Sequence, residues 1–248
     1  MPIEYARGLT ATVRTRTDNM HLGVGLAFVA GATNGGAYLA VHQYTSHMTG
    51  IVSSMADALA LREYPVFLTG LGALLSFVAG AATTAVIVNQ ARRRGWSSAF
   101  ALPLLLEAML LLLFGLVGPQ LNRFHTVFAP ATVSLLCFLM GLQNAVITKI
   151  SQAEIRTTHV TGLVTDLGIE LGRLLSGRRD DVASAERAVA ERNRLLLLSL
   201  LLGGFFIGGV VGATAFKALG YIATVPLALV LVGLAAVPIL DDVRRALR

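Results

Sequence analysis

The fold of this chain is decided by residues 31–61, GATNGGAYLAVHQYTSHMTGIVSSMADALAL, which recur in a related form at 141–175, GLQNAVITKISQAEIRTTHVTGLVTDLGIELGRLL. Both copies open on Gly-x-x-Asn and continue to His-x-Thr-Gly. Asn34 and Asn144 are 110 positions apart, whereas Thr49 and Thr161 are 112 apart, so the second copy carries two extra residues between its motifs. Repetition of this kind in an apolar chain indicates a body of two related halves, as in many transporters.

The composition is that of an integral membrane protein. Of the 248 residues, 55% are apolar and only 14% are charged, against about 25% charged residues in a typical soluble domain. Six stretches have the roughly 17 to 25 apolar residues that a membrane-spanning helix needs: 21–42, 66–90, 97–118, 126–148, 195–216 and 218–240. We therefore predict an all-α membrane protein of about six spans with no separate soluble domain.

Each predicted half holds three spans and one short helix. The first repeat covers 21–118 and the second 119–240, between a cytoplasmic leader, 1–20, and a cytoplasmic tail, 241–248. An odd number of spans inverts the second half relative to the first. Segments 45–62 and 157–175 are less apolar than the spans and have helical periodicity, so we expect amphipathic or re-entrant helices there. In the second, leucines 163, 167, 171 and 174 with Val164 should form an apolar face opposite Asp166, Glu170 and Arg173.

Positive charge predicts the topology. With a cytoplasmic N-terminus, 17 of the 20 Lys and Arg residues fall on the cytoplasmic side, leaving Arg62, Arg123 and Lys217 outside. This bias follows the positive-inside rule and places loop 43–64 outside and loop 150–194 inside. The basic residues border apolar spans instead of forming a stripe interleaved with aromatic residues, which argues against nucleic-acid binding.

Four polar residues within the spans are candidates for substrate binding or ion coupling: Asn34, Glu107, Gln143 and Asn144. A carboxylate at bilayer depth costs about 2.5–3.5 kcal/mol on insertion scales, so Glu107 has either a functional role or a hydrogen-bonded structural one. The amides need partners away from water and could also serve as interhelical contacts. Asn34 and Asn144 hold equivalent places and could meet near the pseudo-two-fold axis. Glycines beside them could unwind the two helices there.

The repeated turns are candidates for gates or helix caps: His47, Thr49, Gly50, His159, Thr161, Gly162 and Asp166. Thr49 or Thr161 could cap the helix that follows it, and a helix start attracts anions. Inversion of the halves predicts that the first turn lies near the outer face and the second near the inner face. We expect no metal site and no cofactor, because the five histidines are scattered and there is no Walker A, HExxH or Gly-x-Ser-x-Gly motif. An enzyme is therefore not expected.

The second spans of the two halves can also be aligned. Ser76-Phe77-Val78-Ala79-Gly80 matches Phe205-Phe206-Ile207-Gly208-Gly209, an offset of 129. Gly208 and Gly212 have the small-x-x-x-small spacing that lets membrane helices approach closely. These glycines are predicted to be packing positions.

Three motifs of the second half stand out: Met140-Gly141-Leu142-Gln143-Asn144-Ala145, Thr158-His159-Val160-Thr161-Gly162 and Asp166-Leu167-Gly168. With these motifs and, more loosely, with His47-Met48-Thr49-Gly50, the chain resembles the YoaK family, also called DUF1275, over about 21–240. The resemblance implies a multi-pass protein of the bacterial cytoplasmic (inner) membrane with about six spans, similar in layout to half of a major-facilitator transporter. It supplies no substrate.

The expected function is movement of a small, unidentified solute across the lipid bilayer by alternating access of two inverted repeats, with a homodimer as a plausible assembly. The alternative is a non-transporting scaffold or sensor that docks a partner through loop 176–194.

Overall fold

All regular secondary structure is helical in the part of the chain that the computed structural model describes, residues 15–121, 125–152, 155, 157–176 and 183–247. This confirms the predicted all-α membrane class. Residues 1–14 of the expected leader and 177–182 of the expected docking loop lie outside the described residues.

Six long helices correspond to the six predicted spans: α2 (Arg16–Val41), α4 (Tyr64–Arg93), α5 (Ala101–Leu121), α6 (His125–Ile150), α8 (Ala183–Leu219) and α9 (Thr224–Ala246). By length and hydropathy, five segments of the described chain can cross a membrane, and the last of them, Val189–Arg245, runs through both α8 and α9. Within it, Gly220 adopts a left-handed φ of 62° and opens the 3-10 turn Gly220–Ala223. The exact number of crossings stays a prediction.

α2 begins earlier than hydropathy predicts. Thr15 caps it by accepting a hydrogen bond from the Asp18 amide (3.2 Å), and the Asp18 carboxylate accepts one from the Thr15 amide (2.9 Å). This capping box satisfies free N–H groups at the helix start. Residues 16–20 of the expected leader are therefore helical.

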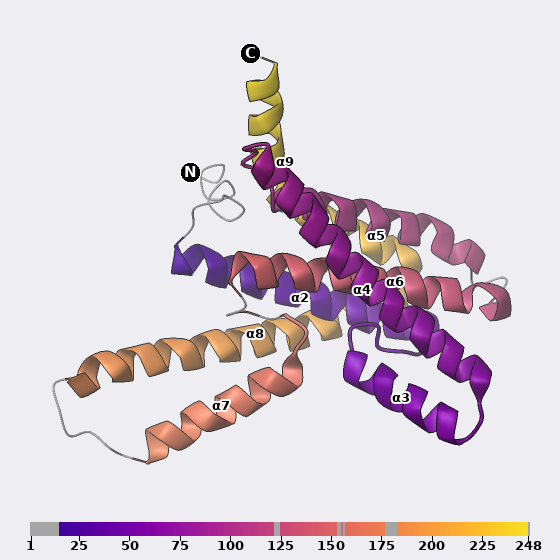
Figure 1. The fold of residues 1–248 in the computed structure, drawn as a ribbon, viewed down its shortest axis with the longest axis horizontal. Coiled ribbons are helices and arrows are strands. Elements are labelled where there is room, and N and C mark those ends of the chain that lie inside the picture. The colour runs from indigo at the N-terminus through magenta and orange to yellow at the C-terminus, as the bar shows by residue number, and fades with distance from the viewer. Residues whose placement is uncertain (1–14, 122–124, 153–154, 156, 177–182, 248) are drawn as a thin grey trace.

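Two short helices follow the first long helix of each half: α3 (Met48–Ala60) packs on α4, and α7 (Val160–Leu175) packs on α8. Figure 1 shows α3 and α7 on the same side of the molecule, running outward from its middle in opposite directions. Their starts therefore lie toward the middle of the molecule and their ends toward its two extremities.

Close helix pairs join the two halves. A Cβ on Gly31 of α2 would collide with the carbonyl oxygen of Phe205 in α8, and a Cβ on Gly141 of α6 would collide with that of Phe77 in α4. The reciprocal contacts are of the same kind: a Cβ on Gly208 would collide with the Phe28 carbonyl oxygen, and a Cβ on Gly80 would collide with that of Phe138. Glycine lets the backbones touch, as small residues do at membrane helix interfaces. The first helix of each half thus packs on the second long helix of the other half.

These contacts correct two expectations from the sequence. Phe77 is equivalent to Phe205, and Gly80 to Gly208, so the second spans align at an offset of 128 instead of 129. α2 and α6 are also continuous helices through their glycines, with no unwound segment. The glycines beside Asn34 and Asn144 serve close packing, which requires an intact helix.

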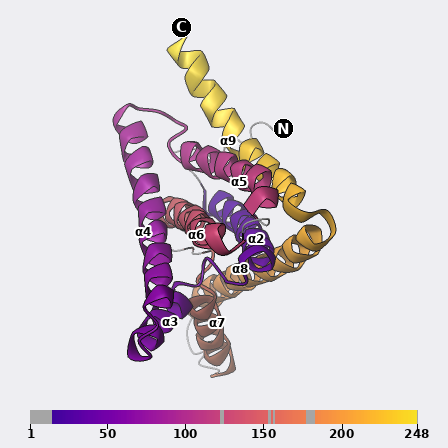
Figure 2. The same ribbon diagram turned by 90° about the vertical axis from the view of Figure 1, so that its right-hand side faces the viewer.

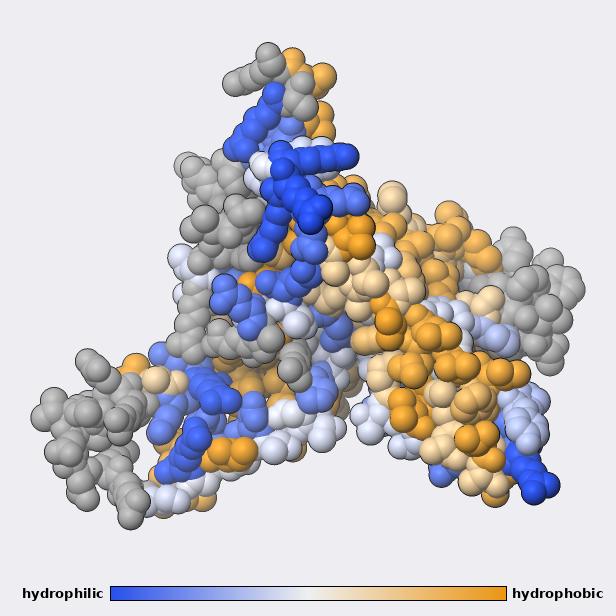
Figure 3. All heavy atoms as spheres, viewed as in Figure 1, coloured by the Kyte–Doolittle hydropathy of each residue, from blue (hydrophilic) through white to orange (hydrophobic). Residues whose placement is uncertain are grey.

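α2 and α6 occupy the interior of the bundle. Figure 2 shows both of them between α4 on one side and α5, α8 and α9 on the other. Figure 3 shows hydrophobic side chains over α4, and hydrophilic ones near the C-terminal end of α4 and over α7. The distribution suits helices that face lipid along their length and water at their ends.

The short helices bury only part of their predicted apolar faces. On α7, Leu163 of that face is buried together with Glu170 of the opposite face, whereas Val164, Leu171 and Leu174 are exposed. On α3, Ile51 and Ala58 are buried and Leu59 is exposed. In lipid an apolar face gains little by turning inward, so a polar contact such as that of Glu170 influences how α7 is oriented.

Candidate functional site

A cavity of about 630 Å³ lies where α2, α4, α6 and α8 meet the starts of α3 and α7. Its described lining consists of Asn34, Tyr44, Ser46, His47, Met48, Thr49, Phe77, Asn144, Thr148, Thr158, His159, Val160, Thr161 and Phe205. Phe77 lies near the middle of α4, so the cavity is placed at mid-length of that helix. We call it the central cavity.

The lining of the central cavity is repeated between the two halves. Twelve of its fourteen residues form six pairs at the offsets of the repeat: 34/144, 46/158, 47/159, 48/160, 49/161 and 77/205. The other two described lining residues are Tyr44 and Thr148. The cavity is therefore built in nearly equal parts by both copies of the repeated block.

Each asparagine holds the turn that precedes a short helix. The Ser46 hydroxyl donates to Asn34 Oδ1 (3.2 Å), and the Thr158 hydroxyl donates to Asn144 Oδ1 (2.8 Å). Both hydroxyls stand directly before the histidine of the His-x-Thr-Gly motif. The first helix of each half thus fixes where its short helix begins.

The threonines do not cap the short helices, which corrects our expectation. The residues at the N-cap positions are His47 and His159, and neither helix start has a side-chain cap hydrogen bond. Thr49 and Thr161 already lie inside the first turn, where a side chain no longer reaches back to the free N–H groups as an N-cap residue does.

Glycine at the third helical position accommodates the histidine ring. A Cβ on Gly50 would lie 2.5 Å from Nδ1 of His47, and a Cβ on Gly162 would collide with the same atom of His159. A larger residue would displace the imidazole. The Gly of His-x-Thr-Gly is thus explained by the place of the ring.

The two turns do not lie at opposite faces, as inversion of the halves had suggested. His47, Thr49, His159 and Thr161 all line the central cavity. The physical reason is that each short helix starts inside the molecule and leads the chain outward. The N-terminal ends of α3 and α7 therefore converge on one space.

The other candidates lie apart from this cavity or behind its wall. The Gln143 amide donates to the Leu26 carbonyl (3.1 Å) and joins α6 to α2. Asp166 pairs with Arg194 of α8 (3.3 Å). Glu107 is 1% exposed, and neither of its carboxylate oxygens has a hydrogen-bond partner among the described residues. None of these three side chains belongs to the described lining of the central cavity.

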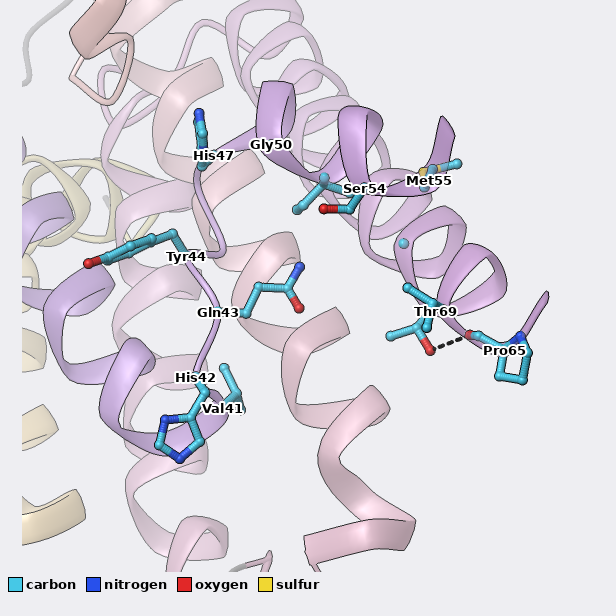
Figure 4. Close-up of a pocket in the computed structure, with 13 residues that line it drawn as sticks. Val41, His42, Gln43, Tyr44, His47, Gly50, Ser54, Met55, Pro65 and Thr69 are labelled. Atoms are coloured by element: carbon cyan, nitrogen blue, oxygen red, sulfur yellow. Dashed lines mark hydrogen bonds between the residues drawn. The ribbon is translucent and has the colours of Figure 1, made fainter. Parts of the chain in front are cut away.

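A second cavity of about 580 Å³ adjoins the first and shares Tyr44 and His47 with it. Figure 4 shows its wall, formed by the segment from Val41 to His47, by α3 and by the start of α4 near Pro65 and Thr69. These residues lie at the end of the molecule where α2 finishes and α4 begins. Tyr44 and His47 stand between this outer cavity and the central one.

Sequence reasoning missed six lining residues of the central cavity that carry a polar or aromatic group: Tyr44, Ser46, Phe77, Thr148, Thr158 and Phe205. Ser46 has a visible signal, because it and Thr158 precede the histidine in both copies. An alignment shifted by one residue would also have paired Phe77 with Phe205.

Comparison with known proteins agrees with the resemblance in the motifs. The model of DUF1275, a protein family of unknown function, matches residues 22–237. The UPF0700 transmembrane protein YoaK of Bacillus subtilis (strain 168) is 28% identical over 145 residues, which cover 57% of this chain and 62% of that protein. No solved structure matches the chain. Because the family model covers most of its length, the chain belongs to the DUF1275 family.

Proposed function

We propose that this transmembrane protein carries a small solute across the bacterial inner membrane by exposing the central cavity alternately to each side. The observation that carries the proposal is the repetition of the cavity lining, six residue pairs drawn from both halves. Many transporters bind their substrate near the bilayer midplane at the interface of two repeats. A scaffold that only docks partners has no use for a polar space of this kind between its helices.

The packing indicates which bodies would move. α2 is locked to α8, and α6 to α4, through glycine contacts between backbones. Each locked pair joins a helix from one half with a helix from the other. Rocking therefore takes place between the α2–α8 pair and the α4–α6 pair and not between the halves of the sequence. A homodimer remains compatible with this motion.

Cysteine accessibility tests the proposal in a Cys137→Ala background. Thr49→Cys and Thr161→Cys report on the cavity, and Ala27→Cys, at a fully buried position outside the cavity lining, is the unreactive control. Glu63→Cys marks the proposed outer side, and Ser184→Cys the proposed cytoplasmic side. A small membrane-impermeant thiol reagent is added to right-side-out and to inverted vesicles.

Alternating access requires both cavity positions to react in both vesicle types, because the two states interconvert. The markers should each react in one type only, Glu63→Cys in right-side-out vesicles. Labelling of both cavity positions from a single side would show a static vestibule and contradict the carrier. Reversed labelling of the two markers would contradict the proposed orientation alone.

A further inference from the structure

We propose that the central cavity binds a small anion, either an inorganic one or the carboxylate group of an organic solute, between the starts of α3 and α7. This deepens the carrier proposal by naming the class of its solute. The inference combines three observations on the cavity: free backbone donors from two helices, an amide donor on the largely buried Asn34 that has no partner among the described residues, and a described lining that contains no charged side chain.

The helix starts supply the free donors. The helical hydrogen bonds begin with Ile51 N–H to the His47 carbonyl (3.1 Å) and Leu163 N–H to the His159 carbonyl (3.1 Å). Within the described residues, the N–H groups of Thr49 and Thr161 have no backbone partner, and neither helix start has a side-chain cap, whereas the Met48 N–H donates to the Ser46 carbonyl (3.2 Å). Uncapped N–H groups and the positive end of the helix dipole together favour an anion.

Asn34 provides an independent sign of a missing ligand. The residue is 6% exposed and lines the cavity. The Ser46 backbone N–H and hydroxyl both donate to its Oδ1 (3.4 and 3.2 Å). A backbone N–H can only donate, so this atom must be the oxygen and the other is Nδ2. Nδ2 has no partner among the described residues, whereas Nδ2 of Asn144 donates to the Met140 carbonyl (2.8 Å).

The described lining favours an anion over a cation. It contains no Asp, Glu, Lys or Arg, so a cation would meet no carboxylate. A carboxylate or oxyanion would meet the Asn34 amide, threonine hydroxyls, two imidazoles and the uncapped N–H groups. Each of these groups can donate a hydrogen bond to such a ligand. A ligand with several acceptor atoms and one negative charge therefore matches both the donors and the lack of charged side chains in the described lining.

Thermal unfolding of the purified protein tests the binding. The probes are sodium chloride, nitrate, formate and acetate, each titrated at constant ionic strength, and a separate series varies the cation at fixed anion. A ligand that binds the folded state raises the unfolding midpoint as its concentration passes the dissociation constant. We expect a saturable rise with at least one anion and none with the cation series. The inorganic and carboxylate arms distinguish the two sources of the anion.

Two variants locate the site. Asn34→Asp removes the free donor and adds a negative charge, and Asn89→Asp makes the same change outside the cavity lining. Val160→Pro removes one free N–H at the helix position that tolerates proline best, and Val160→Ala keeps it. Asn34→Asp and Val160→Pro should each weaken binding by roughly tenfold or more, the loss of one hydrogen bond to a charged group. Their controls should bind like the parent.

The outcomes separate this inference from the carrier proposal. Saturable anion binding that depends on Asn34 and on the Val160 N–H, together with one-sided labelling of the cavity, supports the anion site and rejects transport. Two-sided labelling without binding of any probe rejects the anion site alone. Binding that both variants leave unchanged also overturns the inference, and Val160→Pro decides the matter if Asn34→Asp fails to fold.

Discussion

Asn34 and Asn144 hold equivalent places, yet their amide groups are used differently. Both accept a hydroxyl from the turn before a short helix, but only Asn144 also donates to its own helix, through the Met140 carbonyl. The internal bond ties the Asn144 side chain to α6, while the Asn34 donor remains available to the cavity. The same residue at equivalent positions of the repeat therefore makes different contacts, and the site is asymmetric.

Close approach of α2 and α8 depends on single glycines. A Cβ on Gly208 would collide with the Phe28 carbonyl, whereas a Cβ on Gly203, in the same helix, meets nothing within 4 Å. Gly208→Ala should therefore lower the free energy of unfolding by about 1–3 kcal/mol, a typical cost of overpacking. Gly203→Ala should leave it unchanged or raise it by about 0.5–1 kcal/mol, because alanine favours helix more than glycine does.

Thermal unfolding in detergent, with retention of helicity as the check on folding, compares the two variants. Equal stability of Gly208→Ala and Gly203→Ala would show that α2 and α8 lie farther apart than described here.

Glu107 is buried in α5 with both carboxylate oxygens unpartnered among the described residues. A charge in such surroundings is costly, so the neutral amide of Glu107→Gln should preserve folding. Glu107→Lys should cost about 2.5–3.5 kcal/mol, the insertion penalty of a cation at the centre of a membrane helix. Yield and thermal stability of both variants measure this difference. If the glutamine variant is as unstable as the lysine variant, the carboxylate is ionised and paired with a group outside the described residues.

At the scale of elements, one arginine fastens α7 to α8. Arg194 contacts Asp166 (3.3 Å) and Glu170 (3.3 Å), and Arg173 of α7 contacts the same Glu170 oxygen (3.1 Å). The Glu170 side chain is 2% exposed, whereas that of Arg194 is 50% exposed. Removing the partner of a buried charge costs more than removing an exposed ion pair.

Arg194→Met should therefore loosen α7 and cost about 1–2 kcal/mol, less than a fully buried pair because Arg194 is half exposed and Glu170 keeps Arg173. Hydrogen exchange should become faster in α7 and stay unchanged in α5 and α9. Asp166→Asn, which removes only an exposed partner, is the matched control and should have a smaller effect. Unchanged exchange in Arg194→Met would mean that other contacts hold α7.

The elements were far easier to predict from sequence than their orientations. Runs of apolar residues located all six long helices, and helical spacing located both short ones. The burial of Glu170 on α7 could not be predicted from that spacing, because it depends on where Arg194 of another helix meets Glu170. In a soluble protein, apolar periodicity marks the helix face that packs on the core, but in lipid that rule no longer applies.

At the scale of the whole molecule, repetition identified much of the candidate site but not its location. The repeated motifs singled out Asn34, Asn144, His47 and His159, which the structure brings to one cavity. The count of spans predicted that the two turns lie at opposite faces. This prediction was wrong, because a count cannot show that a short helix begins in the interior. In the structure, α2 packs on α8 and α6 packs on α4, so each half packs on the other. This arrangement could not be predicted from the sequence either, because it depends on contacts between backbones far apart in the chain.

The central claim is that the two short helices begin at one shared cavity. Thr49→Cys and Thr161→Cys, combined in a Cys137→Ala chain, test it by treatment with a short bifunctional thiol reagent and mass spectrometry of the linked peptides. Both positions line the central cavity, so a cross-link within one chain is expected. Leu61→Cys with Leu175→Cys, at the outer ends of α3 and α7, should give none. If the turns lay on opposite faces, a hydrocarbon core of about 30 Å would separate them. Both cysteines would then each carry a molecule of reagent without any linked peptide, and this result would contradict a shared cavity.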